Sequence, residues 1–202
     1  MRNTRDRLTG AARALMTERG VLEVSIAEIT QRAEANVALV SYHFNGREGL
    51  MLAVAEADAE LTLADLDRLV AADVAAAEKI RQHITAIVRV YGQRPYLNRL
   101  LQKLLREGTH DTARHVAEIF MRPIASAPRQ IITAGIAAGE FRLVDPALVS
   151  FAIDGACAQI FTSPEAREAV LDDSRMSDDL LERYAASTAA LIIAGLMAPP
   201  PI

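Results

Sequence analysis

The sequence predicts an all-α fold: a small N-terminal three-helix domain built around a helix-turn-helix, followed by a larger C-terminal helical domain. Apolar residues recur at helical spacing along most of the 202 residues, and helix-start and helix-stop signals separate these stripes. Aromatic residues make up only 4% of the chain, there is no Trp, and no alternation typical of strands occurs. We therefore expect about nine or ten helices and no sheet.

The first predicted helix runs from about Thr4 to Arg19. It carries an apolar stripe at i, i+3, i+4, i+7 and i+8, formed by Leu8, Ala11, Ala12, Leu15 and Met16. Gly20 follows directly, and glycine is a typical helix stop at this position.

Two short helices joined by a tight turn are predicted between residues 25 and 44. Ser25 is a good N-cap, and Glu28 three residues later completes a capping box. Asn36 offers a second N-cap before a helix from about Val37 to His43. Each helix is too short to be stable alone, so both need the first helix behind them. This is the geometry of a helix-turn-helix.

The remaining helices are predicted from their own boundary signals. After the Asn45-Gly46 turn, Arg47 opens a long helix that continues to about Ala72. The later signals are an N-cap at Asp73, a break at Pro95, a stop near Gly108, a start at Asp111, interruptions or kinks at Pro123 and Pro128, a stop at Gly139, starts at Asp145-Pro146, Ser163-Pro164 and Ser177, and a stop at Ala198 with its prolines.

The cysteine content and the two ends of the chain indicate the cellular compartment of the protein. The single cysteine, Cys157, allows no internal disulfide and no Cys-based zinc site, and it favours a reducing cytosol. The charged first residues lack the apolar segment of a signal peptide, and the apolar run near the C-terminus is short for a bilayer span. We predict a cytoplasmic protein with no membrane partner.

The sequence contains no recognisable catalytic motif. Glu107 and His110 imitate one half of a di-metal motif that needs two such pairs, and there is no Gly-rich phosphate loop or nucleophile elbow. Cys157 lies among apolar residues and is expected to be an inert buried thiol. We therefore expect no enzyme activity, no cofactor and no metal.

Positive charge gathers at the N-terminal end, although the net charge of the chain is −4. Residues 1–47 contain seven arginines and five acidic residues, a net charge of +2, so the remainder carries −6. This distribution is compatible with a nucleic-acid partner at that end. A solvated surface of mixed charge explains it about as well.

The N-terminal motifs resemble those of the TetR/AcrR family of bacterial transcription regulators. The resemblance rests on Leu8, Ala11-Ala12, Leu15 and Glu18-Arg19-Gly20, on Ser25-Ile26, Ile29 and Ala33, and on NVALVSYHFNGREGL from Asn36 to Leu50. It is clear over the first quarter of the chain, and the rest agrees in helix count and arrangement. One departure is Glu34, where the family usually has glycine in the turn. Either the turn avoids the left-handed conformation that glycine tolerates, or Glu34 is strained.

The resemblance implies a DNA-binding domain over residues 1–47 whose second short helix enters the major groove. The candidate DNA contacts are Ser25, Asn36, Val37, Ala38, Leu39, Ser41, Tyr42, His43 and Arg47. The apolar tip of this helix can touch thymine methyl groups but cannot hydrogen-bond to base edges. The hydroxyl, imidazole and guanidinium groups can donate to phosphates, which position the protein without specifying sequence.

Base specificity is then expected from Asn36, from Arg2 or Arg5, and from DNA shape. For Tyr42 and His43 the alternative is packing against the neighbouring helices. Val40 and Phe44 are expected in the core.

The resemblance also implies that residues 48–202 bind a ligand and form a homodimer. Small residues on the last two long helices would let a second subunit approach closely, or would form an ordinary intramolecular seam: Ala152, Gly155, Ala156, Ala189 and Gly195. Candidate ligand contacts, for which core or surface roles are the alternative, are Tyr91, Arg94, Tyr96, Gln102, Arg106, Phe120 and Met121. Ligand binding would move the long helix after Gly46 and change the spacing of the recognition helices.

The leading hypothesis is a ligand-responsive regulator that binds a double-stranded DNA operator as a homodimer. As a repressor, it would be released from the operator by a small, largely apolar effector. One alternative is a helical enzyme or small-molecule carrier whose helix-turn-helix-like N-terminus only packs. Another is a TetR-like protein that binds DNA for an architectural or activating role.

Overall fold

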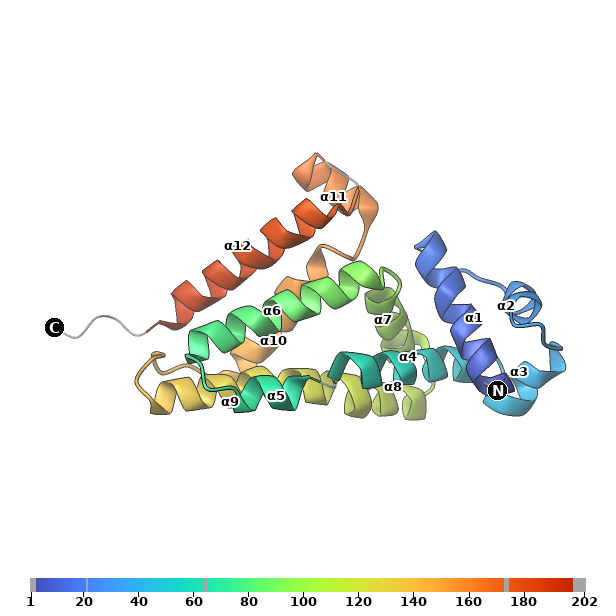
Figure 1. The fold of residues 1–202 in the computed structure, drawn as a ribbon, viewed down its shortest axis with the longest axis horizontal. Coiled ribbons are helices and arrows are strands. Elements are labelled where there is room, and N and C mark those ends of the chain that lie inside the picture. Colours follow the sequence, from blue (N-terminus) through green and yellow to red (C-terminus); the bar gives the residue numbers. More distant parts are fainter. Residues whose placement is uncertain (1–2, 21, 64, 173–174, 198–202) are drawn as a thin grey trace. The chain divides into compact units, whose positions relative to one another are not determined.

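The computed structural model describes residues 3–20, 22–63, 65–172 and 175–197, and these residues are predominantly helical (Figure 1). They form twelve α-helices and one π-helical segment, more than the nine or ten helices expected. Within them the only β feature is an isolated bridge between Phe141 and Met197, so the predicted all-α class is confirmed.

Contacts divide the chain into two compact units, which are described separately. Unit 1 contains Met1–Thr62 and Gln93–Phe120, and unit 2 contains Leu63–Gly92 and Met121–Ile202. This division follows contact density. The predicted domain boundary after residue 47 stays a prediction.

Unit 1 is built from α1 (Thr4–Arg19), α2 (Ile26–Arg32), α3 (Ala38–Phe44), α4 (Arg47–Leu63), α7 (Leu97–Glu107) and α8 (His110–Val116). α1 packs against α2 and α3, and α7 packs against α8. The predicted stripe of α1 is fully buried, as are Ile29 of α2 and Leu50 and Val54 of α4. Val40 and Phe44 of α3 are also buried, as expected, and they anchor this short helix to the core.

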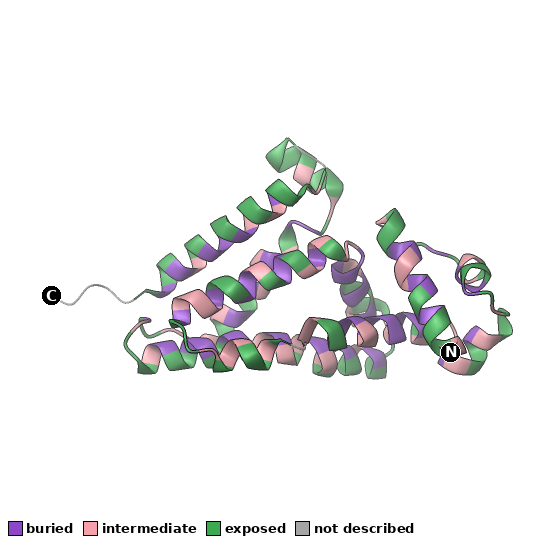
Figure 2. Ribbon diagram, in the orientation of Figure 1, coloured by how far each residue is buried: buried purple, intermediate pink, exposed green. Residues whose placement is uncertain are grey.

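Unit 2 contains α5 (Leu66–Ala71), α6 (Ala76–Gln93), α9 (Arg122–Ala137), α10 (Pro146–Gln159), α11 (Pro164–Leu171) and α12 (Asp178–Leu196). α9 packs against α5 and α10, and α10 packs against α12. Figure 2 shows the buried residues as stripes along the longer helices, and these stripes form the apolar core. Ile80, Ile84, Ile132 and Ile153 are completely buried there.

Most predicted helix boundaries are confirmed by their hydrogen bonds. Gly20 ends α1 with a left-handed φ of 64°. The side chains of Asp145, Ser163 and Ser177 accept backbone N–H hydrogen bonds at the starts of α10, α11 and α12. The predicted stop at Ala198 lies outside the described residues.

The prediction of one helix from Arg47 to about Ala72 is wrong. α4 ends at Leu63, and α5 is a separate short helix that buries no residue. The last buried residue of α4 is Ala59, and Leu61 is exposed. Since packing of an apolar face supplies most helix stability, the loss of buried residues after Ala59 accounts for an early end of α4.

The predicted N-cap at Asp73 is also wrong. α6 begins at Ala76, and the Glu140 carboxylate accepts hydrogen bonds from the backbone N–H groups of Ala76 and Ala77, at 2.8 and 2.7 Å. The cap therefore comes from 64 residues away in sequence. A carboxylate at this place also interacts favourably with the helix dipole.

The helical run continues through both prolines, at which an interruption or a kink was expected. The π-helical segment η1 (Ala117–Met121) directly precedes α9, whose first turn holds Pro123, and Pro128 lies inside α9. α8 begins at His110 with Thr109 as N-cap, one residue before the predicted start. A π-helical segment is a common way to absorb an irregularity in a continuous helix.

Candidate DNA-binding site

The helix-turn-helix is formed by α2 and α3, and it leaves one face of α3 exposed. The predicted helix Val37–His43 is observed one residue later, at Ala38–Phe44. Asn36 still acts as a cap, because its Oδ1 accepts the Ala38 N–H at 2.8 Å. The exposed face carries Val37, Ala38, Ser41 and Tyr42.

Tyr42 is the most prominent side chain on this face. It is 81% exposed, so within unit 1 it does not pack into the core. Its ring meets the His43 ring edge to face, with the centroids 4.9 Å apart, and His43 is half-buried. The Tyr42 hydroxyl is therefore presented to solvent on a helix whose opposite face is anchored.

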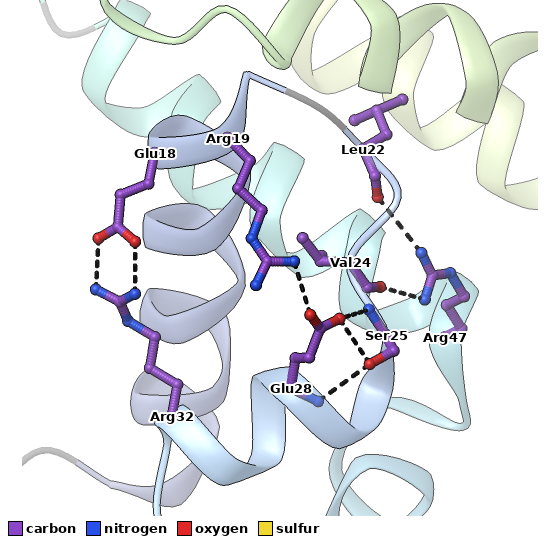
Figure 3. Close-up of polar contacts among 8 residues, drawn as sticks. All are labelled: Glu18, Arg19, Leu22, Val24, Ser25, Glu28, Arg32 and Arg47. Atoms are coloured by element: carbon purple, nitrogen blue, oxygen red, sulfur yellow. Dashed lines mark hydrogen bonds and ion pairs between the residues drawn. The ribbon is translucent and has the colours of Figure 1, made fainter.

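The predicted capping box at the start of α2 is confirmed (Figure 3). The Ser25 hydroxyl accepts the Glu28 N–H at 3.2 Å, and the Glu28 carboxylate accepts the Ser25 N–H at 2.8 Å. Arg19 of α1 adds an ion pair to Glu28 at 2.7 Å. The hydrogen bonds from the Ser25 backbone and side chain, together with Arg19, lower the pKa of Glu28 to about 2. The capping carboxylate is thus ionised throughout the physiological range.

Glu34 lies in the turn between α2 and α3, where the sequence left its backbone conformation open. Its φ is 48°, so a glutamate adopts the left-handed conformation that glycine favours. The Arg7 guanidinium of α1 donates to the carbonyl oxygens of Ala33, at 3.0 and 2.5 Å, and of Glu34, at 2.6 Å. Arg7, which the sequence analysis did not single out, therefore clamps the strained turn.

Arg47 also has a structural position. Its guanidinium donates to the carbonyl oxygens of Val24 and Leu22, at 2.7 and 3.4 Å, in the segment between α1 and α2 (Figure 3). A second ion pair joins Arg32 to Glu18, at 2.5 Å. Arg47 was expected to donate to DNA phosphates, and in the structure its guanidinium donates to backbone carbonyl oxygens.

The N-terminal arginines are engaged within unit 1. The described arginines up to residue 47 contact carboxylates or carbonyl oxygens: Arg5 with Glu56, Arg7 with the turn, Arg13 with Asp58, Arg19 with Glu28, Arg32 with Glu18, and Arg47 with the inter-helix segment. Arg5 lies in the first turn of α1, and Arg2 lies outside the described residues. The exposed residues of the α3 face, Val37, Ala38, Ser41 and Tyr42, all have uncharged side chains.

A buried carboxylate ties α1, α4 and α7 together. Asp58 is completely buried, its Oδ2 accepts the Tyr96 hydroxyl at 2.6 Å, and its Oδ1 lies 2.7 Å from the Arg13 guanidinium. Arg94 is 3.5 Å from the same oxygen and donates to Thr62. Arg99 of α7 also donates to the carbonyl oxygen of Gly20. These links hold α7 to the helices that carry the helix-turn-helix.

The candidate ligand contacts are divided between the two units. Tyr91 and Met121 belong to unit 2, and the other five belong to unit 1. Gln102 and Arg106 are exposed on α7, whereas Tyr91 and Phe120 are buried. Arg94 forms an ion pair with Asp58, and Tyr96 donates a hydrogen bond to it. A cleft of about 330 Å³ in unit 1 is lined instead by Leu22, Glu23, Arg47, Glu48, Met51, Leu100, Lys103, Leu104, Glu107 and Gly108.

The candidate dimer contacts are mixed in their exposure. Ala152, Gly155 and Gly195 are exposed, and a Cβ at either glycine would meet open space. Ala156 is half-buried, and Ala189 is completely buried inside unit 2. Large exposed apolar side chains on the same helices were missed: Leu148, Phe151 and Leu191. The spacing of Leu148, Phe151 and Gly155 at i, i+3 and i+7 was a readable signal for a second apolar face.

Among the described residues, no three His, Cys, Asp or Glu side chains are placed to hold a metal ion together. None of the described helices combines the length and the apolar character that spanning a membrane requires.

A capped helix-turn-helix with one exposed face, clamped to further helices, defines a helix-turn-helix regulator. Comparison with known families narrows this class. The profile of the tetracyclin repressor-like C-terminal domain matches residues 73–201, and that of bacterial regulatory proteins of the tetR family matches residues 8–54. The chain belongs to the TetR family, as the N-terminal motifs predicted. It is a ligand-responsive, DNA-binding transcriptional regulator.

Solved structures share this fold over nearly the whole chain. A bacterial regulatory protein of the tetR family from Rhodococcus RHA1 is 21% identical, with 98% of this chain and 100% of that chain covered and a TM-score of 0.77. FadR from Bacillus subtilis, in complex with stearoyl-CoA, is 18% identical over 94% of this chain and 98% of that chain, with a TM-score of 0.75. RolR, in complex with resorcinol, is 26% identical over 98% and 95%, with a TM-score of 0.60. A search of curated protein sequences finds no significant match.

Proposed function

We propose that this regulator is a repressor that binds a two-fold symmetric operator as a homodimer and is released by a small, largely apolar effector. The exposed face of α3 carries the proposal: Tyr42 is 81% exposed on a short helix whose other face is buried. A packing role alone would not require an anchored helix with a solvent-facing hydroxyl. This argues against an enzyme or carrier with a purely structural helix-turn-helix.

In this proposal α3 contacts DNA in two ways. Val37, Ala38 and Leu39 lie at its N-terminal end and can touch thymine methyl groups. The hydroxyls of Ser41 and Tyr42 and the imidazole of His43 donate to phosphates, while Ser25 stands at the start of α2. Asn36 and Arg5 remain the candidates for base readout. Arg47 contributes mainly by holding the segment before α2.

The homodimer is proposed to form through α10 and α12. Phe151 is 79% exposed, and Leu148 and Leu191 are almost as exposed on these two neighbouring helices. Exposed apolar side chains around Ala152, Gly155, Ala156 and Gly195 fit a tight helix–helix interface. Ala189 is excluded from it, because it is buried within unit 2.

The proposed effector and compartment rest on different grounds. FadR is solved with stearoyl-CoA, which has an apolar acyl chain, and RolR with resorcinol, which has an aromatic ring, and both complexes support an effector with an apolar part. A repressor has to meet chromosomal DNA, so we infer a cytoplasmic protein, and we propose no enzyme activity. An architectural or activating role differs from repression only in the transcriptional outcome.

Selection of bound DNA from a random pool tests the proposal. We expect a two-fold symmetric site, with half-sites whose centres lie about one helical turn, ~34–36 Å, apart. A transcription assay on that site, with and without effector candidates, then separates repression from activation. Recovery of no enriched site would refute DNA binding and favour the carrier or enzyme.

Tyr42→Phe tests the contact on α3. Loss of one hydroxyl–phosphate hydrogen bond should weaken operator affinity by about 1 kcal/mol, roughly fivefold. The loss should be similar on unrelated DNA, because phosphate contacts carry no sequence information. Tyr184→Phe, in unit 2, is the matched control and should leave affinity unchanged. Equal affinity of the Tyr42 variant and the native protein would remove Tyr42 from the interface.

Phe151→Asp tests the dimer. Placing a charge on the proposed interface should give a monomer in sedimentation at micromolar concentration. Leu143→Asp changes an equally exposed apolar residue outside α10 and α12 and should leave the dimer intact. A monomeric native protein would refute the interface assignment.

A further inference from the structure

The interior of unit 2 contains a carboxylate that the protein does not neutralise. Oδ1 of Asp154, on α10, is fully buried, and no donor among the described residues forms a hydrogen bond to it. Burial raises the pKa of Asp154 above its ordinary value. Carboxylates shielded from water without a partner are costly, and such a group is a candidate for function.

Other polar and aromatic groups lie around Asp154. Tyr91 of α6 is buried, and burial, with a smaller contribution from the Asp154 carboxylate, raises its pKa. Burial and then Asp154 raise the pKa of Cys157, one turn further along α10, to about 12. The carboxylate is therefore close to both groups, and neither is a cation that could offset its charge.

Tyr91 also forms an aromatic pair with Phe161, which follows the end of α10. The rings of Tyr91 and Phe161 meet edge to face, with their centroids 5.5 Å apart. Tyr184 of α12 donates its hydroxyl to the carbonyl oxygen of Ala156. Residues of α6 and α12 thus contact the segment from Ala156 to Phe161, which follows Asp154 closely in the chain. As a residue Asp154 is only partly buried, so the carboxylate reaches from the surface into the interior.

We propose that Asp154, together with Tyr91 and its aromatic partner Phe161, recognises the protonated amino group of an amphipathic organic cation. An ammonium group would supply both the charge and the donors that Oδ1 lacks, through a charge-assisted hydrogen bond. Aromatic faces attract cations as well, and the apolar core of unit 2 suits the rest of such a molecule. This inference rests on the proposed function and specifies its effector as a cation with an apolar body.

Titration calorimetry on the full-length protein at neutral pH tests this inference with pairs of probes. Each pair joins an amine to the alcohol of the same shape: phenethylamine with 2-phenylethanol, and octylamine with octanol. We expect at least one amine to bind about tenfold or more tightly than its alcohol, which corresponds to about 1.4 kcal/mol. Asp154→Asn should remove this preference and leave the binding of the alcohol unchanged.

Asp179→Asn is the matched control, because Asp179 is an exposed carboxylate on α12 of the same unit. It should keep the preference for the amine. Equal binding of amine and alcohol in both pairs, binding of none of the four probes, or an amine preference that survives Asp154→Asn would overturn the inference. Operator binding is measured on the same samples. If operator binding is intact but no amine preference is found, the proposed recognition of an organic cation is refuted, while the proposed function as a DNA-binding regulator is not.

Discussion

The two units differ in whether a buried carboxylate has a charged neighbour. Among the described residues, buried polar atoms without a hydrogen bond occur in both units, including Oδ1 of Asp58 and Nε of Arg13 in unit 1. In unit 1, the buried Asp58 has an arginine and a tyrosine hydroxyl at 2.7 and 2.6 Å, and the strained turn at Glu34 is held by Arg7. In unit 2, neither ring nitrogen of the buried His83 has a hydrogen-bond partner among the described residues, and Oδ1 of Asp154 has none either.

The difference follows from what each unit has to do. The helix-turn-helix must present α3 in one fixed geometry, and the pairing of Asp58 with Arg13 and Tyr96 within unit 1 favours such rigidity. A unit that responds to a ligand can keep polar groups whose partner arrives with the ligand. We therefore expect the aspartate of unit 1, Asp58, to stabilise the fold and the aspartate of unit 2, Asp154, to destabilise it.

Asp58→Asn should produce the largest effect. It removes the charge that faces Arg13 and leaves that guanidinium without compensation, which should lower the free energy of unfolding by about 3 kcal/mol. Urea unfolding followed by circular dichroism measures this change. Asp65→Asn breaks an exposed ion pair with Arg68 and should cost under about 0.5 kcal/mol. Equal effects of the two variants would mean that Asp58 is not a buried structural charge.

His83 should make the protein sensitive to acid. Burial lowers its pKa from 6.5 to about 4, so between these values the unfolded chain binds the proton first. Its contribution is fully present above pH 6.5 and is lost as the pH falls to about 4, in total about 3 kcal/mol. Unfolding curves of the native protein and His83→Leu across this range measure it. The variant should show a shallower loss, and parallel pH profiles would contradict the assignment.

Asp154→Asn should raise stability at neutral pH, the opposite sign to Asp58→Asn. The folded-state pKa of Asp154 is raised, so its carboxyl group favours folding most at low pH, where it is protonated, and this advantage is lost as the pH rises through the folded pKa. Removing the unpaired charge should add about 1 kcal/mol. Thermal unfolding without ligand measures the gain, with Asp179→Asn as the unchanged control. A destabilised Asp154→Asn variant would show that the carboxylate has a partner within the fold.

Glu34→Gly should give the smallest change. Glycine adopts φ 48° without the steric cost that glutamate carries, and this should add roughly 0.5–1 kcal/mol to stability, partly offset by the greater entropy of the unfolded chain. The same unfolding assay measures it. Because the Arg7 bonds go to carbonyl oxygens, they should survive the substitution. A loss of stability would mean that the Glu34 side chain supports the turn.

The sequence determined those features of this protein that depend on near neighbours in the chain. The capping box of Ser25 and Glu28, the stop at Gly20 and the caps at Asp145, Ser163 and Ser177 all join groups within a few residues. The apolar stripe of α1 and the family motifs from Asn36 to Leu50 were readable for the same reason. They were enough to predict the helical class, the helix-turn-helix and the family.

Only the tertiary structure decided which distant groups meet. Glu140 caps α6 from 64 residues away, and Arg7 reaches the turn at Ala33 across 26 residues. The end of α4 at Leu63, the burial of Ala189 and the isolation of Asp154 depend likewise on which faces pack together. An apolar stripe in the sequence shows that a helix has a buried face, but it does not show which other helix packs against that face. In the sequence, the N-terminal arginines were compatible with a DNA-binding surface or with a solvated surface of mixed charge. In the fold, the described ones contact carboxylates or carbonyl oxygens of unit 1.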